Sequence, residues 1–473
     1  MTIQSAALLE RRLFLLAPPG LIAFAAIIAV VIFASLGGHS AVERSAQAQT
    51  AFTAEREASR TEWRESMAQI EAAGSAEAPY EARPMNIRIP AVLPPTPLGD
   101  FAIGDTEILP NTTEISGWSN PANLFSEYEF DNPTPLSLGS FDMTFIVVVL
   151  MPLLMIAVSF DLFASDRERG RARLLAAQTG QIAPTIWRRL IIRNAALWAV
   201  FAASTAIAAL LAPMGADTGL RLTHFVVWLT IALLYGLFWF AAITLVSAIL
   251  RRSETVASAL FALWAIFVFA VPAVGGAIAE ASYPPPSRLA YLSQMRQGEV
   301  KAVRETAELT SGFLADHPEM TVSDEDVPGY FSSTFLANEE ARKRTAPVLE
   351  AFNNSRQQRM ALVAKLQYLS PALIADRAMT AVAGGGDARG LAFQDQAYIA
   401  LNDLVQRIGP AVVARQRISL AEYDAIPAFA FRERSMGEIF STMMLPMVVL
   451  LLLTIALLII AYRRMAAPLE QLL

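Results

Sequence analysis

The sequence predicts an all-α polytopic membrane protein with about six transmembrane helices and two large, mainly helical extracytoplasmic insertions. Hydrophobic residues make up 54% of the 473 residues and charged residues only 17%, which is too apolar for a soluble protein of this length. Apolar runs of about twenty residues recur, and a helix of that length crosses the hydrocarbon of a bilayer. Long polar segments follow the first and the fifth of these runs.

Six apolar runs are long enough to cross a bilayer as helices. They lie near Leu13 to Leu36, Phe145 to Phe163, Ala195 to Pro213, Phe225 to Leu250, Val256 to Ala279 and Ile439 to Tyr462. Arginines cluster at alternate ends of these runs: Arg11 and Arg12, Arg167 to Arg193, Arg251 and Arg252, and Arg463 and Arg464. An even number of spans puts all these clusters on one side, which the positive-inside rule makes the cytoplasm. Both termini are therefore expected to be cytoplasmic.

The first run begins within ERRLFLLAPPG (10–20), which resembles a twin-arginine export signal. The run is longer than the core of a signal peptide, and cleavage would leave an odd number of spans and invert the later arginine clusters. We therefore expect an uncleaved first helix.

The spans divide the chain into five parts. These are 1–38 with the first span, 39–142 and 280–437 as the extracytoplasmic insertions, 143–279 with spans two to five, and 438–473 with the last span. In the first insertion, Trp63, Met67 and Ile70 share one helical face, which predicts an amphipathic helix that continues out of the first span. The proline-rich stretch 81–100 is expected to be extended. The second insertion has mainly helical patterns, with breaks expected at His317-Pro318, Pro328-Gly329, GGGDARG (384–390) and Pro410.

Several kinds of functional site are not expected in this chain. It has no cysteine, so it can form neither a disulfide nor a thiolate metal site. The three histidines, His39, His224 and His317, lie far apart, and no metal-binding spacing occurs. No serine-nucleophile motif is present, and GGGDARG lacks the lysine of a phosphate loop. A net charge of −6 argues against nucleic acid as a partner. The sequence thus predicts no catalytic, cofactor or metal site.

The interiors of the expected spans contain no Lys, Arg, Asp, Glu or His. Ion-coupled carriers usually bury such groups at the bilayer midplane, so energy from an ion gradient is disfavoured. Pro152, Pro272 and Pro446 lie inside spans, and ordinary packing is favoured over a role as kinks for conformational change. Trp228 and Tyr235 share one face of the fourth span with Trp239, where interhelical packing is favoured over a path for an amphiphilic substrate.

The stretch SFDLFASDRERGRARLLAAQTG (159–180) changes abruptly from apolar to charged. Ser165 and Glu168 have the spacing of a capping box, which predicts a helix that starts at Asp166. Thr179-Gly180 offers a stop, and Pro184 fits the first turn of the next helix. A short cytoplasmic helix over 166–178 is therefore expected between spans two and three.

At these residues the chain resembles the membrane subunit of an ABC transporter of the type-2 exporter class. In those permeases, a helix with a consensus close to S-x-E-R-E-x-G-T-L-x-x-L-L docks onto a separate ATPase subunit. The segment ASDRERGRARLL matches at Ser165, Arg167, Glu168, Gly170, Leu174 and Leu175, with Asp166 in place of a glutamate and Arg171-Ala172 in place of T-L. The stretches NPTPLSLGSFDMTFIVVVLMPLL, YLSPALIADRAM and SLAEYDAIPAFAF are similar to a subgroup with two large extracytoplasmic insertions of unknown function.

The resemblance implies an assembly of two permease chains, identical or paralogous, with two cytoplasmic ABC ATPase subunits. ATP and Mg would bind to the ATPase, and the helix at 166–178 would transmit its movement to the spans. The expected location is the bacterial inner membrane, with an amphiphilic substrate exported or extracted and a possible periplasmic partner. Substrate-binding residues are not assigned.

Two alternatives stay open at the level of sequence. The chain could be an ATPase-linked mechanotransmitter that acts on a periplasmic partner without translocation, which the long helix after the first span favours. It could also be a membrane sensor with a periplasmic helical domain, although no cytoplasmic output domain is evident.

Overall fold

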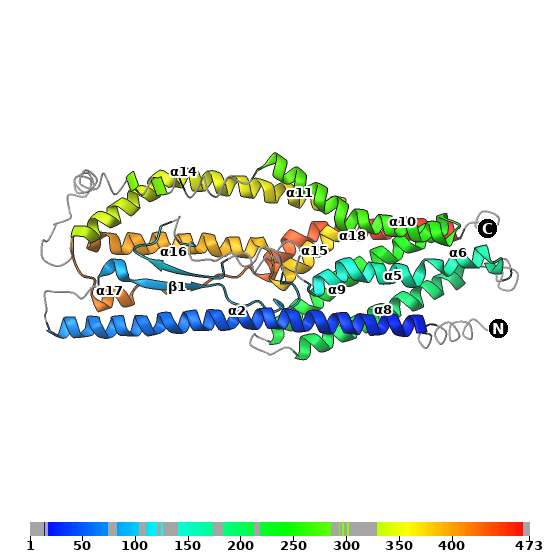
Figure 1. The fold of residues 1–473 in the computed structure, drawn as a ribbon, viewed down its shortest axis with the longest axis horizontal. Coiled ribbons are helices and arrows are strands. Elements are labelled where there is room, and N and C mark those ends of the chain that lie inside the picture. Colours follow the sequence, from blue (N-terminus) through cyan, green and yellow to red (C-terminus); the bar gives the residue numbers. More distant parts are fainter. Residues whose placement is uncertain are drawn as a thin grey trace.

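A computed structural model describes residues 14, 18–73, 83–103, 110–120, 124–125, 141–172, 174, 183–211, 218–284, 293, 296–297, 300–301 and 329–466. In these residues, six helical runs are long and apolar enough to cross a membrane: Pro18–Ala73, Met143–Glu168, Ala183–Leu211, Gly219–Ile249, Ser253–Ser282 and Met436–Met465. The runs lie side by side in one half of an elongated molecule, and an outer domain forms the other half (Figure 1). The chain is an all-α polytopic membrane protein, as predicted.

Helix α2 (Pro18–Ala73) is the first span and also a wall of the outer domain. Its 56 residues continue unbroken past the boundary expected after residue 38. Trp63, Met67 and Ile70 are buried in the core of the outer domain, which confirms the predicted amphipathic continuation. At Gly38 an added Cβ would lie 2.1 Å from the carbonyl oxygen of Asp100, so only glycine allows this close approach between the helix and the first insertion.

The remaining spans are built from helices of different regularity. Their bounds are α4 (Met143–Phe145), η4 (Ile146–Leu150), α5 (Met151–Ser159) and α6 (Asp161–Glu168) in span two, α8 (Ala183–Leu211) in span three and α9 (Thr218–Ile249) in span four. Span five comprises α10 (Ser253–Ala265), η5 (Ile266–Ala270) and α11 (Val271–Ser282), and span six is α18 (Met436–Met465). The segments η4 and η5 are π-helical turns, which the sequence analysis did not foresee.

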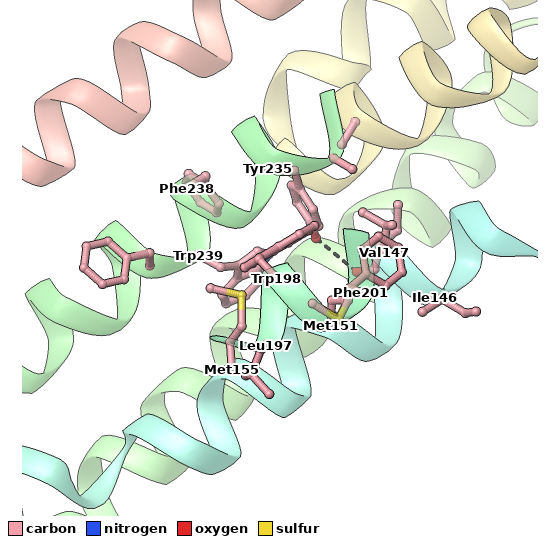
Figure 2. Packing of buried hydrophobic residues seen from close by; sticks show 14 of the residues in the cluster. Ile146, Val147, Met151, Met155, Leu197, Trp198, Phe201, Tyr235, Phe238 and Trp239 are labelled. Atoms are coloured by element: carbon pink, nitrogen blue, oxygen red, sulfur yellow. Dashed lines mark hydrogen bonds between the residues drawn. The ribbon is translucent and has the colours of Figure 1, made fainter. Parts of the chain in front are cut away.

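Helix α9 runs through the middle of the bundle and contacts α18, α8 and α5. Trp228, Tyr235 and Trp239 are fully buried. Figure 2 shows Tyr235 and Trp239 packed among Trp198, Phe201 and the side chains of span two. Their burial supports the packing interpretation of this aromatic face.

The outer domain combines helices with a small sheet. Strand β1 (Arg88–Val92) pairs antiparallel with β2 (Thr112–Ser116), with Ile89 opposite Ile115. The helices are α14 (Gly329–Leu366), the short 3₁₀ turn η6 (Gln367–Leu369), α15 (Pro371–Ala383), α16 (Asp387–Val413) and α17 (Leu420–Asp424). The extended conformation expected over 81–100 is confirmed in β1, but Pro84–Asn86 form a 3₁₀ turn, η2. Strand β2 was not predicted.

The expected breaks in the second insertion had different outcomes. Gly384 and Gly386 have positive φ angles, so the GGGDARG turn is confirmed. The break at Pro410 is wrong, because α16 continues to Val413. In the last turn of a helix proline removes only one intrahelical donor, and its own carbonyl still accepts the N–H of Ala414. His317, Pro318 and Pro328 lie outside the described residues.

Candidate functional site at the arginine-rich end of the bundle

The arginine clusters of the described chain lie at the end of the bundle away from the outer domain. The end of α6, the start of α2 and the end of α18 are found at this end (Figure 1). Helix α6 follows α5 almost without interruption, because the N–H of Phe160 still bonds to the carbonyl of Ile156. Span two therefore extends its helix to Glu168.

The predicted capping box and the helix start at Asp166 are wrong. Ser165 lies inside α6, and its carbonyl accepts the N–H of Arg169 at 3.1 Å. The helix ends at Glu168, and Gly170 adopts φ +69°, the left-handed conformation that glycine takes after a helix end. Helical geometry resumes at Arg171 and Ala172, so the expected 166–178 helix is interrupted. Leu175, Thr179 and Gly180 lie outside the described residues.

Asp166 is buried and joins α6 to span three. Its carboxylate lies 2.6 Å from Nη1 of Arg189 in α8 and 3.0 Å from Nη2 of Arg171. Two guanidinium groups compensate the loss of hydration that burial imposes on this charge. Span three is also bonded to span two through Arg193, whose Nη1 donates to the carbonyl of Val158 at 2.9 Å.

Arg167 binds the end of span four. Its guanidinium donates to the carbonyl of Leu250 at 2.8 Å and to that of Ala248 at 3.3 Å. Carbonyls at a helix C-terminus lack intrahelical donors and carry partial negative charge. The side chain also lies over the ring of Phe163, with Cζ 3.6 Å from the ring centroid, which adds a cation–π contact.

Glu168 binds the start of span five. Its carboxylate accepts the backbone N–H of Ser253 at 2.7 Å and lies 3.2 Å from the Ser253 hydroxyl. Arg252, the N-cap residue of α10, makes no side-chain cap of its own, so the cap comes from span two. Arg167 and Glu168 together hold the turn between spans four and five. We call Asp166, Arg167 and Glu168 the span junction.

The surface next to the span junction combines exposed arginines with an exposed leucine. Arg169, Gly170 and Arg171 are exposed, and so are Arg251 and Arg252 across the turn. Leu174 is 63% exposed. Among the described residues, no three His, Cys, Asp or Glu side chains are grouped as they would be to hold a metal ion. The arrangement offers a contact surface backed by helix-to-helix bonds.

The sequence analysis selected the span-junction residues but not what they bind. It placed them on a short cytoplasmic helix between spans two and three and named no partners, whereas their partners are Arg189, the carbonyl of Leu250 and Ser253. The serine that begins α10 directly after Arg251-Arg252 is a helix-start signal. This signal marks the tight turn that Arg167 and Glu168 hold.

One part of the chain matches a known protein family. Residues 288–432 match the family model of a domain of unknown function (DUF3526), and this range contains α14, α15, α16 and α17 of the outer domain. No match was found among curated proteins. Fold and comparison together define a polytopic membrane protein whose outer domain resembles a family of unknown function.

Proposed function

We propose that this chain is the permease subunit of an ATP-driven ABC transporter of the type-2 exporter class, powered by a separate ATPase subunit and acting on an amphiphilic substrate. The span junction carries the proposal. One short segment continues span two and bonds to span three through Asp166, to span four through Arg167 and to span five through Glu168.

This geometry suits transmission of movement from a soluble partner. In the proposal, the exposed residues Arg169, Gly170, Arg171 and Leu174 meet the ATPase. Asp166, Arg167 and Glu168 carry the displacement into four spans. Ser165 helps to position Arg171, because its hydroxyl accepts a hydrogen bond from Nη2 of Arg171 at 3.3 Å. Gly170 shapes the turn through its positive φ angle.

The energy source is the second argument for an ATPase partner. The apolar interiors of all six spans contain no Lys, Arg, Asp, Glu or His, which ion-coupled transport usually requires. The chain itself would be no enzyme and would hold no cofactor, and ATP and Mg would bind to two ATPase copies. A second permease chain, identical or paralogous, would complete the assembly.

The proposed location is the bacterial inner membrane, with the arginine-rich end and both termini in the cytoplasm, as the positive-inside rule requires. The outer domain would then be periplasmic, where it can meet a substrate or a partner protein.

A mechanotransmitter is the second candidate, and the tip of α2 favours it. Trp63 stacks on Tyr423 of α17 with ring centroids 3.9 Å apart, and Arg64 pairs with Asp424 at 2.9 Å. Helix α2 therefore joins the first span to the far end of the outer domain. A movement of the spans could reach a periplasmic partner along it without translocation.

Co-purification from the native host tests the proposal. The tagged chain is solubilised in mild detergent, and bound proteins are identified and quantified by mass spectrometry. One soluble ABC ATPase per chain is the expected result. A signalling kinase without an ATPase would instead favour a sensor, and no bound ATPase would contradict the proposal. ATP-dependent substrate accumulation in sealed vesicles would then distinguish a transporter from a mechanotransmitter.

A further inference from the structure

Spans two and five each contain a π-helical turn placed just before a proline. In η4 the N–H of Met151 bonds to the carbonyl of Ile146, and in η5 the N–H of Val271 bonds to that of Ile266, five residues earlier in each case. Pro152 and Pro272 are the next residues. Proline cannot donate an N–H and its ring crowds the preceding turn, and the wider π-turn relieves that crowding.

Proline alone does not produce these turns. Helix α18, which is described throughout, remains α-helical on both sides of Pro446. Pro446 therefore provides a matched comparison inside the same bundle. Single π-turns are rare and often lie at functional sites, and two of them occur here in neighbouring spans.

In the π-turn of span two, side chains of other spans bind the backbone carbonyls. The hydroxyl of Tyr235 in span four donates a hydrogen bond to the carbonyl of Val148 at 3.1 Å. A dashed line marks the hydrogen bond of the Tyr235 hydroxyl in Figure 2. Trp264 of span five donates its indole N–H to the carbonyl of Val149 at 3.0 Å. A backbone carbonyl without a donor is strongly unfavourable inside a membrane, so these bonds allow the turn to keep its irregular geometry.

In the π-turn of span five, the donor comes from the outer domain. Ser370, fully buried, donates its hydroxyl to the carbonyl of Phe267 at 2.6 Å. The same hydroxyl caps α15 by accepting the N–H of Leu373. Helix α15 contacts both π-turns and packs against α9 and α18. It therefore anchors the outer side of the two turns.

The parts of spans two and five on either side of the π-turns are held by different partners. On the arginine-rich side, Glu168 bonds to Ser253, and α10 packs against α5 and α6. On the outer side, Asp142 caps α4 and also accepts the N–H of Ile103 at 3.1 Å, while α11 packs against α14. The arginine-side halves also pack against α9, and that of span two packs against α8 as well. Each span thus has one half bound to other spans and one half bound to the outer domain.

We propose that the two π-turns form a paired hinge. The arginine-side halves of spans two and five, α5–α6 and α10, swing as one unit about the carbonyls held by Tyr235, Trp264 and Ser370. The end of α9, to which Arg167 bonds, moves with this unit. The outer halves stay with α15 and the outer domain, and α18 is the reference. This inference concerns the chain alone and does not depend on which partner drives it.

Spin-label distances test the hinge, and the absence of cysteine allows labels to be placed without background. Arg169→Cys with Glu254→Cys measures a distance inside the swinging unit. Glu254→Cys with Arg463→Cys measures the distance from this unit to α18. All three sites are exposed. In lipid nanodiscs, with labelled chain diluted by unlabelled chain, the second pair is expected to give the broader distance distribution.

The prolines supply the second arm of the test. Pro152→Ala with Pro272→Ala restores two N–H donors and favours a regular α-helix, so the distribution between α10 and α18 should lose its excess width. Pro446→Ala should leave that width unchanged. Equal widths for the two label pairs in the native helices would overturn the hinge, even if the double alanine variant failed to fold. The hinge would also be overturned if Pro446→Ala narrowed the distance distribution between α10 and α18 as much as the double alanine variant does.

Discussion

Arg167 and Glu168 are neighbours with opposite charges, and each charge meets the helix end that it complements. The guanidinium lies at the C-terminus of α9, which carries partial negative charge, and the carboxylate lies at the N-terminus of α10, which carries partial positive charge. A charge reversal at Glu168 would put a cation against the start of α10. Such a variant changes the fold of the turn as well as any contact with a partner.

Glu168→Ala is expected to destabilise the protein by about 1 kcal/mol or less, the usual cost of losing a partly exposed helix cap. Glu168→Gln should retain part of the stability, because its amide oxygen can still accept the N–H of Ser253. Thermal unfolding in detergent, followed by circular dichroism, measures the loss. Glu280→Ala, at an exposed position in α11, is the control, and an equal loss there would contradict the cap.

Glu422 gives a pH-dependent prediction in the outer domain. Hydrogen bonds from the backbone and side chain of Ser419 hold the pKa of Glu422 below its ordinary value. A lowered folded-state pKa contributes stability above the unfolded-state pKa, and this stability is lost as the pH falls through the folded-state value. Ser419→Ala should therefore be less stable than the native chain at neutral pH. The difference should shrink in acid.

Thermal unfolding at neutral and acidic pH measures that difference. Ser59→Ala, which removes an exposed hydroxyl bonded only within α2, is the control and should show no such pH dependence. A Ser419→Ala difference that stayed constant into acid would show that Glu422 is not the titrating group.

At the scale of elements, apolar length predicted the spans well because a bilayer imposes that length on any helix that crosses it. Local signals around Ser165 failed because a capping box requires the preceding helix to stop, and α5 and α6 supply no stop before Glu168. The π-turns could not be predicted from the sequence for a different reason. Pro152 and Pro446 look alike in sequence, and the donors Tyr235 and Trp264 come from other spans.

Helix α15 shows the same limit. Ser370-Pro371 is a helix-start signal that the sequence analysis did not use. The place of α15 against α9 and α18 depends on long-range contacts, such as that between Nδ1 of His224 and the carbonyl of Val382, 2.6 Å apart. The span junction was similar, since its residues were found from a motif while their partners were set by the packing of spans three, four and five.

Ser370→Ala is expected to cost more than an ordinary cap. It removes the cap of α15 and also leaves the buried carbonyl of Phe267 without its donor, a loss of about 1–3 kcal/mol for the unsatisfied group. Ser435→Ala is the matched control, because Ser435 caps α18 within its own capping box at an exposed site. Chemical denaturation of both variants compares the losses, and equal values would contradict the bond to span five.

At the scale of the whole molecule, the two ends of the bundle are connected by continuous structure. Helix α2 runs from the arginine-rich end to α17, and spans two and five connect the span junction to α15 through the π-turns. A displacement at the span junction therefore has two routes to the outer domain. This connectivity is what the proposed permease requires of a subunit without its own energy source.

Two exposed leucines, one next to the span junction and one just before α15, allow a comparison that tests the proposed ATPase contact. Leu174 next to the span junction is 63% exposed, and Leu369 at the start of α15 is 61% exposed. Aspartate at either site changes the surface equally, but only Leu174→Asp alters the proposed ATPase contact.

The most direct measurement is ATP turnover by the co-purifying ATPase after reconstitution with each chain in liposomes. The account predicts that the native chain and Leu369→Asp both bind the ATPase and alter its turnover, whereas Leu174→Asp does neither. Identical behaviour of Leu174→Asp and Leu369→Asp, or an ATPase whose turnover ignores the chain, would contradict it.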